Sequence, residues 1–525
     1  MTRPAISRRH PLGGLILALA LAACGSAIAP TAAPTAAPTS AAAQAVSTSA
    51  PAASPIPPTT LPSPTPEPTI PLPTPTPLDP QTLALKPQSA GDRAAGDWPQ
   101  YTMDISADPQ AGTFSGSQII TYTNATGSEL PDLALRSYVN FPPDIMGDGG
   151  DTEMNLLSAS LDGRPLEILR QAQGTLFRLA LPAPLPPGAT VTLLTSFAGT
   201  LKPWDDGTWP FVSAYPLLAE WDGGDWRREV TRFPDRVYAQ AALYDVTVTL
   251  PRDLQVFASG SPIASSDDGA TITTRFISGP VREWAASFGR FEAVRTVTNG
   301  ITVTAYQAEG AGLDLERVRN MAAGSLASFE EHFGPYPYRE LDLHAMLWDG
   351  DAGVEYPGYT LILINQRVSQ RTDFVVAHEV AHQWWYAVVG NDIYREPWLD
   401  EAFANYSAVV AGSDVLGAEA AAAYYAQEIE RAYRAGVENG DYDAGLGIDE
   451  YPSFNAYYRA VYGKGAVFLA TLRAEIGDEA FFAGMRAYYA DQRHAIGTRA
   501  EFQTAMEAAA GRSLAALFDR WLGAR

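Results

Sequence analysis

Two histidines and a glutamate stand at the spacing of a metal-binding helix, in the run His378-Glu379-Val380-Ala381-His382. On an α-helix His378 and His382 lie one turn apart on the same face, so both imidazoles can reach one zinc ion. Glu379 is rotated away from that line but stays near enough to act on a water molecule at the metal. The alternative is a pair of core histidines on a buried helix, with no metal.

A third metal ligand is expected at Glu401, in the run Trp398-Leu399-Asp400-Glu401. A catalytic zinc site has three protein ligands and leaves the fourth position to water. The 18 residues between His382 and Glu401 suffice for a turn and the start of a second helix. A carboxylate among apolar neighbours needs a partner, and zinc would be one. Asp400 could orient a zinc-bound histidine as an acceptor or cap the helix that follows.

The elements that must position these residues are mainly helical. Apolar periodicity and end signals predict a long amphipathic helix over 313–333 and short strands over 341–347 and 359–364. Further helices are predicted over 371–389, 399–412, 415–437, 462–476, 478–491, 498–510 and 512–523. We therefore expect an α+β, mainly helical domain over residues 306–525. His332 and His344 are expected in its core or on its surface, His494 is expected to be exposed, and Trp384 and Trp385 are expected as core anchors.

The preceding segment has the period-two pattern of short strands. Examples are 118–123, 190–194, 244–250 and 270–276, with turn residues between such runs. This pattern predicts an all-β domain over residues 93–305. The expected fold class is therefore multidomain, with an all-β N-terminal domain followed by the α+β domain.

The N-terminal end has the pattern of an export signal followed by a stalk. Arginines precede an apolar stretch that is too short to span a membrane, which indicates a signal peptide over residues 1–23. The chain has 1 cysteine, Cys24, directly after this stretch. This position resembles the bacterial lipoprotein signal, which implies lipid on Cys24; the alternative is a plain secretory signal. Residues 24–92 are rich in Pro, Thr and Ala and predict a disordered stalk.

Composition excludes several classes of protein. With 525 residues, of which 46% are hydrophobic, the chain can form more than one core. Its net charge of -23 argues against a nucleic-acid partner, which would require a basic surface. One cysteine permits neither an intrachain disulfide nor a Cys-based metal site.

Four motifs in the same order resemble the M1 family of zinc aminopeptidases, of the gluzincin group. They are the histidine motif, the Glu401 motif, the upstream run Ala352-Gly353-Val354-Glu355-Tyr356 and the downstream run Tyr462-Gly463-Lys464-Gly465-Ala466. The resemblance implies a saddle-like β-domain and a thermolysin-like catalytic domain. It also implies a short bacterial lipoprotein form without the family's C-terminal helical domain, and so an open cleft.

The resemblance also implies roles for single residues. Tyr462 would stabilise the oxyanion, with Tyr457 and Tyr458 as rivals for that role. Glu355 would bind the α-ammonium of the substrate, and the backbone of Gly353 and Val354 would pair with the peptide. The motif departs from the family pattern, because Val354 replaces Met and Tyr356 replaces Asn. These changes affect the pocket for the first side chain and the geometry of Glu355.

These observations favour an exported zinc aminopeptidase with one zinc ion (Zn2+) per chain. Glu379 would serve as general base, and peptides with a free N-terminus would be the substrates. The expected location is the bacterial cell envelope, with lipid on Cys24 holding the protein at a membrane and the enzyme facing outward. One alternative is a zinc metalloendopeptidase with the same machinery. Another is a non-catalytic surface binding module.

Overall fold

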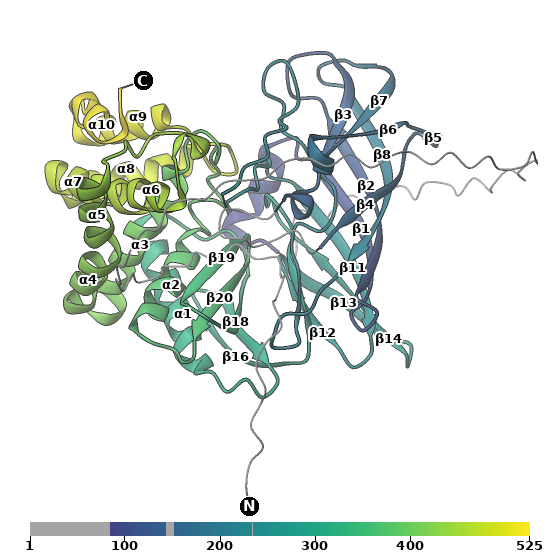
Figure 1. The fold of residues 1–525 in the computed structure, drawn as a ribbon, viewed down its shortest axis with the longest axis horizontal. Coiled ribbons are helices and arrows are strands. Elements are labelled where there is room, and N and C mark those ends of the chain that lie inside the picture. The colour runs from purple at the N-terminus through teal and green to yellow at the C-terminus, as the bar shows by residue number, and fades with distance from the viewer. Residues whose placement is uncertain (1–83, 143–151, 234, 525) are drawn as a thin grey trace, which may run out of the picture. The chain divides into compact units, whose positions relative to one another are not determined.

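The computed structural model of the chain describes residues 84–142, 152–233 and 235–524 (Figure 1). The predicted signal peptide, Cys24 and the predicted stalk as far as residue 83 lie outside the described residues. Within the described ranges, none of the helices combines the length and the apolar character needed to cross a bilayer.

An eight-stranded sheet is the largest element of the N-terminal part, as predicted from the period-two segments. Its order is β13-β14-β11-β1-β2-β8-β4-β5, and β1 runs parallel to β11 while the other pairs are antiparallel. Alternate residues of β1 are buried, as expected of a sheet with one face on a core. The strands are β1 (Gln100–Asp108), β2 (Thr113–Thr123), β4 (Met154–Leu161), β5 (Arg164–Pro165), β8 (Thr190–Thr200), β11 (Leu243–Pro251), β13 (Ser261–Asp267) and β14 (Thr271–Ile277).

Two smaller sheets complete this β-rich part. Their orders are β10-β3-β7-β6 and β12-β15-β9. The strands are β3 (Leu130–Arg136), β6 (Ile168–Gln171), β7 (Leu176–Leu185), β9 (Trp209–Phe211), β10 (Leu217–Leu218), β12 (Gln255–Ala258) and β15 (Ala286–Gly289). Short 3-10 turns lie between strands at η2 (Tyr138–Asn140) and η3 (Ala172–Gly174).

A five-stranded sheet connects the β-rich part to the helices. Its order is β16-β17-β18-β20-β19, and β17, β18 and β20 run parallel. Most residues of these three strands are buried, as is usual for parallel strands, which are covered on both faces. The strands are β16 (Phe291–Thr298), β17 (Ile301–Ala308), β18 (Glu340–Trp348), β19 (Ala352–Tyr356) and β20 (Tyr359–Asn365). The predicted boundary between the two domains, at residues 305/306, falls inside β17. This strand pairs with β18 of the second predicted domain and not with the sheets described above.

Helices make up most of the remainder, as predicted, and gather on one side of the five-stranded sheet (Figure 1). The predicted helix over 371–389 ends early, because the chain turns after Ala381. The helices are α1 (Leu315–His332), α2 (Gln370–Ala381), α3 (Trp398–Leu416), α4 (Ala418–Tyr424), α5 (Arg431–Asn439), α6 (Phe454–Tyr458), α7 (Ala466–Ile476), α8 (Asp478–Asp491), α9 (Arg499–Ala510) and α10 (Ala515–Leu522). Between them lie the π-helical segments η4 (Tyr425–Glu430) and η6 (Arg459–Gly465) and the 3-10 turn η5 (Ile448–Glu450).

The last residues assigned to the stalk are ordered, which corrects the prediction that disorder extends to residue 92. The 3-10 helix η1 (Pro87–Ala95) lies against the helical part of the chain. Just before it, the Lys86 ammonium is 2.5 Å from a Glu330 carboxylate oxygen. Within it, Asp92 accepts a hydrogen bond of 2.7 Å from Arg493 Nε. The composition of this segment predicted disorder. The segment is nevertheless ordered, because it forms contacts with residues far along the chain.

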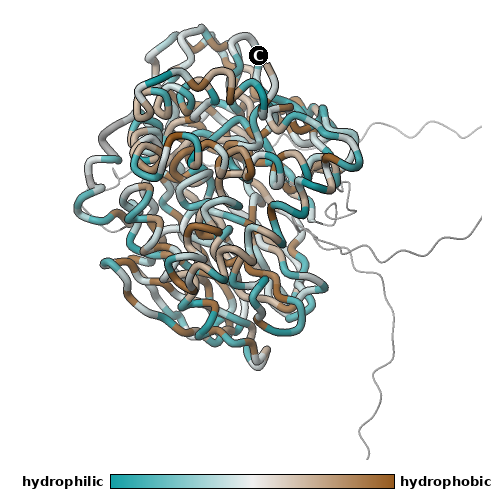
Figure 2. The backbone as a smooth tube through the Cα atoms, turned by 90° about the vertical axis from the view of Figure 1, so that its left-hand side faces the viewer, coloured by the Kyte–Doolittle hydropathy of each residue, from teal (hydrophilic) through white to brown (hydrophobic). Residues whose placement is uncertain are grey.

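The β-rich part and the helical part share one continuous core. In Figure 2 hydrophobic (brown) segments occur throughout the fold and alternate with hydrophilic (teal) ones. Buried charged groups join the two parts. Arg227 Nη1 is 3.1 Å from Asp392 Oδ2, and Arg282 donates to the carbonyls of Tyr386 and Val388. The β-rich part is therefore positioned to contribute residues to a site on the helical part.

Candidate metal and active site

Helix α2 carries the two predicted histidine ligands at its C-terminal end. Ser369 begins the helix with a reciprocal pair of hydrogen bonds to Thr372, which fixes its start. His378 and His382 are buried, and their Nε2 atoms lie 3.0 Å apart. The sequence spacing therefore does place both ring nitrogens at one point.

Helix α3 brings the third predicted ligand to that point. Glu401 Oε2 is 3.2 Å from His378 Nε2 and 3.5 Å from His382 Nε2. Burial raises the pKa of Glu401, but the two histidines outweigh it and hold the pKa well below its ordinary value. Ligand atoms of the three residues all lie within 4.8 Å of one another.

This donor set fits zinc. In the part of the chain that the structure describes, Oε1 of the fully buried Glu401 has no hydrogen-bond partner, and Oε2 faces only the two histidine ring nitrogens. A buried carboxylate left without such partners is costly unless a cation lies against it. Two imidazoles and one carboxylate are a common ligand set of catalytic zinc sites, with the fourth position open. The structure confirms that His378, His382 and Glu401 come together, as predicted, in a set that can hold a metal ion.

Asp400 orients one of the ligands. Its Oδ1 atom is 2.6 Å from His382 Nδ1, so the ring donates from Nδ1 and keeps Nε2 for the metal. Of the two roles left open for Asp400, capping is excluded, because Pro397 is the N-cap residue of α3. Burial lowers the pKa of His382, but Glu355 and Asp400 outweigh it and raise the pKa well above the ordinary value.

Glu379 points from α2 toward strand β19 and is almost fully buried. Burial raises its pKa well above the ordinary value, and the neighbouring carboxylates Glu401 and Asp235 add to this while His382 opposes it. A raised pKa suits a group that must accept and then release a proton. Gly353 on β19 is in close contact with it: a Cβ atom at position 353 would lie 2.3 Å from the Glu379 carboxylate carbon.

Strand β19 lies at the edge of the five-stranded sheet, beside α2. Gln383 holds it there: its Nε2 donates to the Tyr356 carbonyl at 3.0 Å, and its Oε1 accepts from Gly358 N at 2.8 Å. Glu355 on this strand is buried, and burial raises its pKa well above the ordinary value. One carboxylate oxygen of Glu355 lies within 4.8 Å of ligand atoms of His382 and Asp400. The structure thus places Gly353, Val354 and Glu355 beside the metal site.

Tyr462 lies on the π-helical segment η6, and such segments occur frequently at functional sites. Its ring stacks on that of His378 with centroids 6.1 Å apart. Within the described residues its buried hydroxyl has no hydrogen-bond partner, whereas the Tyr457 hydroxyl donates to Asp235 at 2.7 Å. Of Tyr462 and its rival Tyr457, therefore, only Tyr462 has a hydroxyl that is ready to bind something else. Asn405 on α3 holds it in place through the Tyr462 carbonyl at 3.0 Å.

Asp235 is a residue of the site that sequence reasoning missed. It comes from the β-rich part, and its carboxylate lies within 4.8 Å of ligand atoms of Glu355 and Glu401. Burial raises its pKa well above the ordinary value, and Glu401 and Glu355 raise it further. It belongs to no motif and lies in a segment without regular structure, so no signal in the sequence pointed to it.

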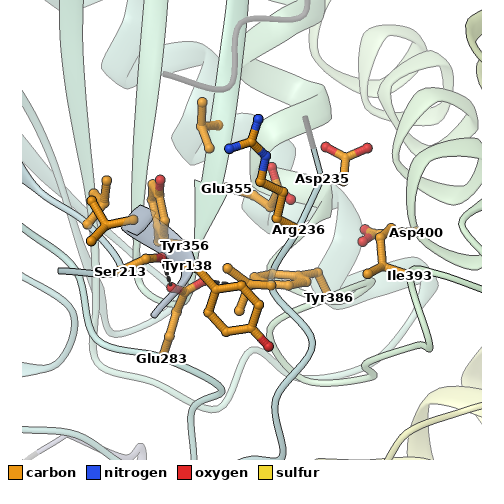
Figure 3. Close-up of a pocket in the computed structure, with 14 residues that line it drawn as sticks. Tyr138, Ser213, Asp235, Arg236, Glu283, Glu355, Tyr356, Tyr386, Ile393 and Asp400 are labelled. Atoms are coloured by element: carbon orange, nitrogen blue, oxygen red, sulfur yellow. Dashed lines mark hydrogen bonds between the residues drawn. The ribbon is translucent and has the colours of Figure 1, made fainter. Parts of the chain in front are cut away.

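A pocket opens beside Glu355 and Asp400 (Figure 3). Its lining comes from both parts of the chain and combines apolar walls with acidic groups. The residues contributed by the β-rich part include Tyr138, Val139, Val212, Ser213, Asp235, Arg236 and Glu283. Glu283 is a second site residue that the sequence did not indicate.

The other histidines among the described residues are structural. His332 Nε2 is 3.0 Å from Asp414 Oδ2, and His344 is buried against Ser287. The expectation that His494 is exposed is wrong: it is 4% exposed, and its Nε2 lies 3.1 Å from Asp92 Oδ2. The ordered segment at η1 covers it. Trp384 and Trp385 are fully buried, as expected of core anchors.

Comparison with known proteins shows similarity to peptidases. Residues 319–521 match the family described as "Peptidase family M1 domain". The chain is 22% identical over 396 residues to Aminopeptidase M1-A of Oryza sativa subsp. japonica, covering 71% of this chain and 44% of that protein. It is 26% identical over 425 residues to Aminopeptidase N of Streptomyces lividans, covering 74% and 48%. The chain spans less than half the length of these two curated relatives.

Solved structures share the fold. A crystal structure of an M1 zinc metallopeptidase from Deinococcus radiodurans has a TM-score of 0.60 and 18% identity, and the match covers 82% of this chain and 94% of that one. A two-domain M1 zinc metallopeptidase bound to L-tryptophan has a TM-score of 0.59 and 18% identity, with the same coverage. The predicted architecture, a β-rich domain followed by a helical catalytic domain, is confirmed.

Proposed function

We propose that the protein is an M1-type zinc aminopeptidase that removes N-terminal residues from peptides. The observation that carries this proposal is the position of Glu355, whose carboxylate lies within 4.8 Å of ligand atoms of His382 and Asp400. A carboxylate at this point binds an α-ammonium through charge-assisted hydrogen bonds. The first peptide bond of such a substrate then lies at the metal site, and a blocked N-terminus loses the interaction.

The residues around the metal divide the chemistry among them. Zinc, when bound, supplies a Lewis acid that polarises the scissile carbonyl and lowers the pKa of water. Glu379 takes a proton from the attacking water and passes it to the leaving amine. The Tyr462 hydroxyl donates to the oxygen on which negative charge develops, a contribution made only while that charge is present.

The edge strand β19 orients the substrate. One side of β19 pairs with β20, and its other side ends the sheet. An extended peptide that adds to this edge gains backbone hydrogen bonds without regard to its sequence. Val354 and Tyr356 then face the pocket for the first side chain, together with the cavity residues already described.

The location is proposed from the sequence of the N-terminal segment. A signal peptide over residues 1–23 and lipid on Cys24 would hold the enzyme at the bacterial cell envelope, facing outward. Growth with a clickable fatty acid tests this. Label is expected on the wild-type chain and is expected to be lost in Cys24→Ser, and equal label on both would contradict the proposal.

The activity is tested by the full chain acting on one peptide set in two forms, with free and with N-acetylated ends. Cleavage restricted to the free form, lost in Glu355→Gln, is the expected result. Comparable cleavage of both forms, unchanged in Glu355→Gln, would overturn the aminopeptidase proposal in favour of a metalloendopeptidase. If the protein with zinc bound cleaves neither form, the result would favour the alternative of a non-catalytic surface binding module.

A further inference from the structure

The carboxylate of Glu283 lies in the cavity wall and has no part in the proposed chemistry. It is fully buried, with Oε2 accepting a hydrogen bond of 2.9 Å from Ser213 and Oε1 accepting one from the Tyr386 hydroxyl. Each carboxylate oxygen can accept two bonds, so each has capacity for one more. Among the described residues, Glu283 forms no ion pair.

The backbone around this carboxylate is held in a costly conformation. Tyr386 has a φ of 145°, which side-chain-bearing residues rarely adopt. Arg282 holds the Tyr386 carbonyl at 2.6 Å, and the next residue, Glu283, accepts from its hydroxyl. Strained backbone persists only where the surroundings enforce it, and such sites cluster where ligands bind.

The cavity extends between two acidic ends. Glu355 and Asp400 lie at the end beside the metal site, and Glu283 lies at the other side of the labelled residues (Figure 3). The walls between these ends include the apolar side chains of Val139, Val212, Val354 and Ile393. A long methylene stem packs against such walls while its charged end reaches a polar partner.

We propose that this cavity binds a first residue with a long cationic side chain, arginine or lysine, and that Glu283 selects it. The inference rests on the proposed function, since it places the α-ammonium at Glu355. A guanidinium can bond both oxygens of Glu283 in a planar fork, so arginine is favoured over lysine. The four acids of the lining, Asp235, Glu283, Glu355 and Asp400, outnumber its one base, Arg236.

The test compares arginine and norleucine 4-nitroanilides, whose side chains share a methylene stem and differ in charge. In the wild type we expect kcat/KM for arginine to exceed that for norleucine by at least tenfold. In Glu283→Gln we expect this ratio to fall at least tenfold, mainly through a higher KM for the arginine substrate. The matched control is Glu220→Gln, another buried carboxylate, which lies outside this cavity and bonds Gln240.

Parallel loss of both substrates in Glu283→Gln would mean a structural role and would overturn the inference. So would a wild-type enzyme with no preference for arginine. Binding gives a second readout: L-argininamide is expected to bind more tightly than L-norleucinamide by calorimetry, with the difference lost in Glu283→Gln. If neither nitroanilide is hydrolysed, the proposed function fails, and the calorimetric difference still decides whether Glu283 selects a cation.

Discussion

Gly353 and Glu379 are in such close contact that only a hydrogen fits between strand β19 and the Glu379 carboxylate. A Cβ atom at position 353 would lie 2.3 Å from the carboxylate carbon and Oε1 of Glu379. The resemblance to the M1 family predicted that the backbone of Gly353 pairs with the peptide. The structure adds a steric reason for glycine at this position, because a larger residue would contact Glu379. The strand that orients the peptide and the helix that supplies the base are thus set at a distance that only glycine allows.

Gly353→Ala is therefore expected to displace Glu379 and to reduce kcat by about 100-fold, since a shift of ~1 Å at a reacting group can cost that much. Zinc content by elemental analysis should stay at one ion per chain, because no ligand moves. Gly224→Ala is the matched control, since a Cβ there meets open space. Activity of Gly353→Ala within twofold of wild type would show that the base is not held by this contact.

Removing the Tyr462 hydroxyl tests its assigned role. Loss of one donor to a developing oxyanion costs about 10²–10³ in kcat, so Tyr462→Phe is expected to fall in that range with KM little changed. Tyr458→Phe is the control, because its ring stacks on Tyr462 at 5.0 Å. If Tyr458→Phe loses as much activity as Tyr462→Phe, the assignment of the oxyanion contact to the Tyr462 hydroxyl alone would be wrong.

Asp400→Asn tests the residue that orients His382. Loss of such an acceptor typically weakens metal affinity by about 10–100-fold, and we expect this loss in a chelator competition assay for zinc. Asp414→Asn removes an acid from another Asp–His pair, at His332 and away from the metal. Its zinc affinity should match that of the wild type. An unchanged zinc affinity in Asp400→Asn would contradict the orienting role.

The preference for arginine is expected to depend on pH. Burial raises the pKa of Glu283 to about 7, and the hydrogen bonds from Tyr386 and Ser213 oppose that rise. The carboxyl group is therefore neutral below that pH and attracts a cation above it, so the ratio of arginine to norleucine kcat/KM should rise from about pH 6 to about pH 8.

Groups that act equally on both substrates cancel in this ratio. Three other acids of the lining, Asp235, Glu355 and Asp400, also have raised pKa values, so comparison with Glu283→Gln is needed to assign the titration. The tyrosines nearby have raised pKa values and stay neutral in this range, and arginines keep their charge. These groups are Tyr138, Tyr215, Tyr244, Tyr356, Tyr386, Arg236 and Arg282. In Glu283→Gln the ratio should not vary with pH, and a persistent rise there would assign the titration to another group.

Local spacing was sufficient for the metal site and for most elements around it. An i, i+4 pair on a helix meets at one point whatever the rest of the fold does, so His378 and His382 were predictable. The helices with clear periodicity and caps were found within a few residues. The end of α2 was not, because the chain leaves the helix there and presents the Tyr386 and Val388 carbonyls to Arg282 of the β-rich part.

Only the tertiary structure decided which residues outside the motifs face the site. Asp235 and Glu283 come from segments more than 90 residues ahead of His378, and burial against the helical part brings them there. It also decided that the Tyr457 hydroxyl is engaged by Asp235, that Asp400 orients His382, and that η1 covers His494. The sequence by itself determined the chemistry of the metal centre, since the spacing of its histidine pair lies within one helix. The walls of the pocket depended on contacts between distant segments, which no local pattern encodes.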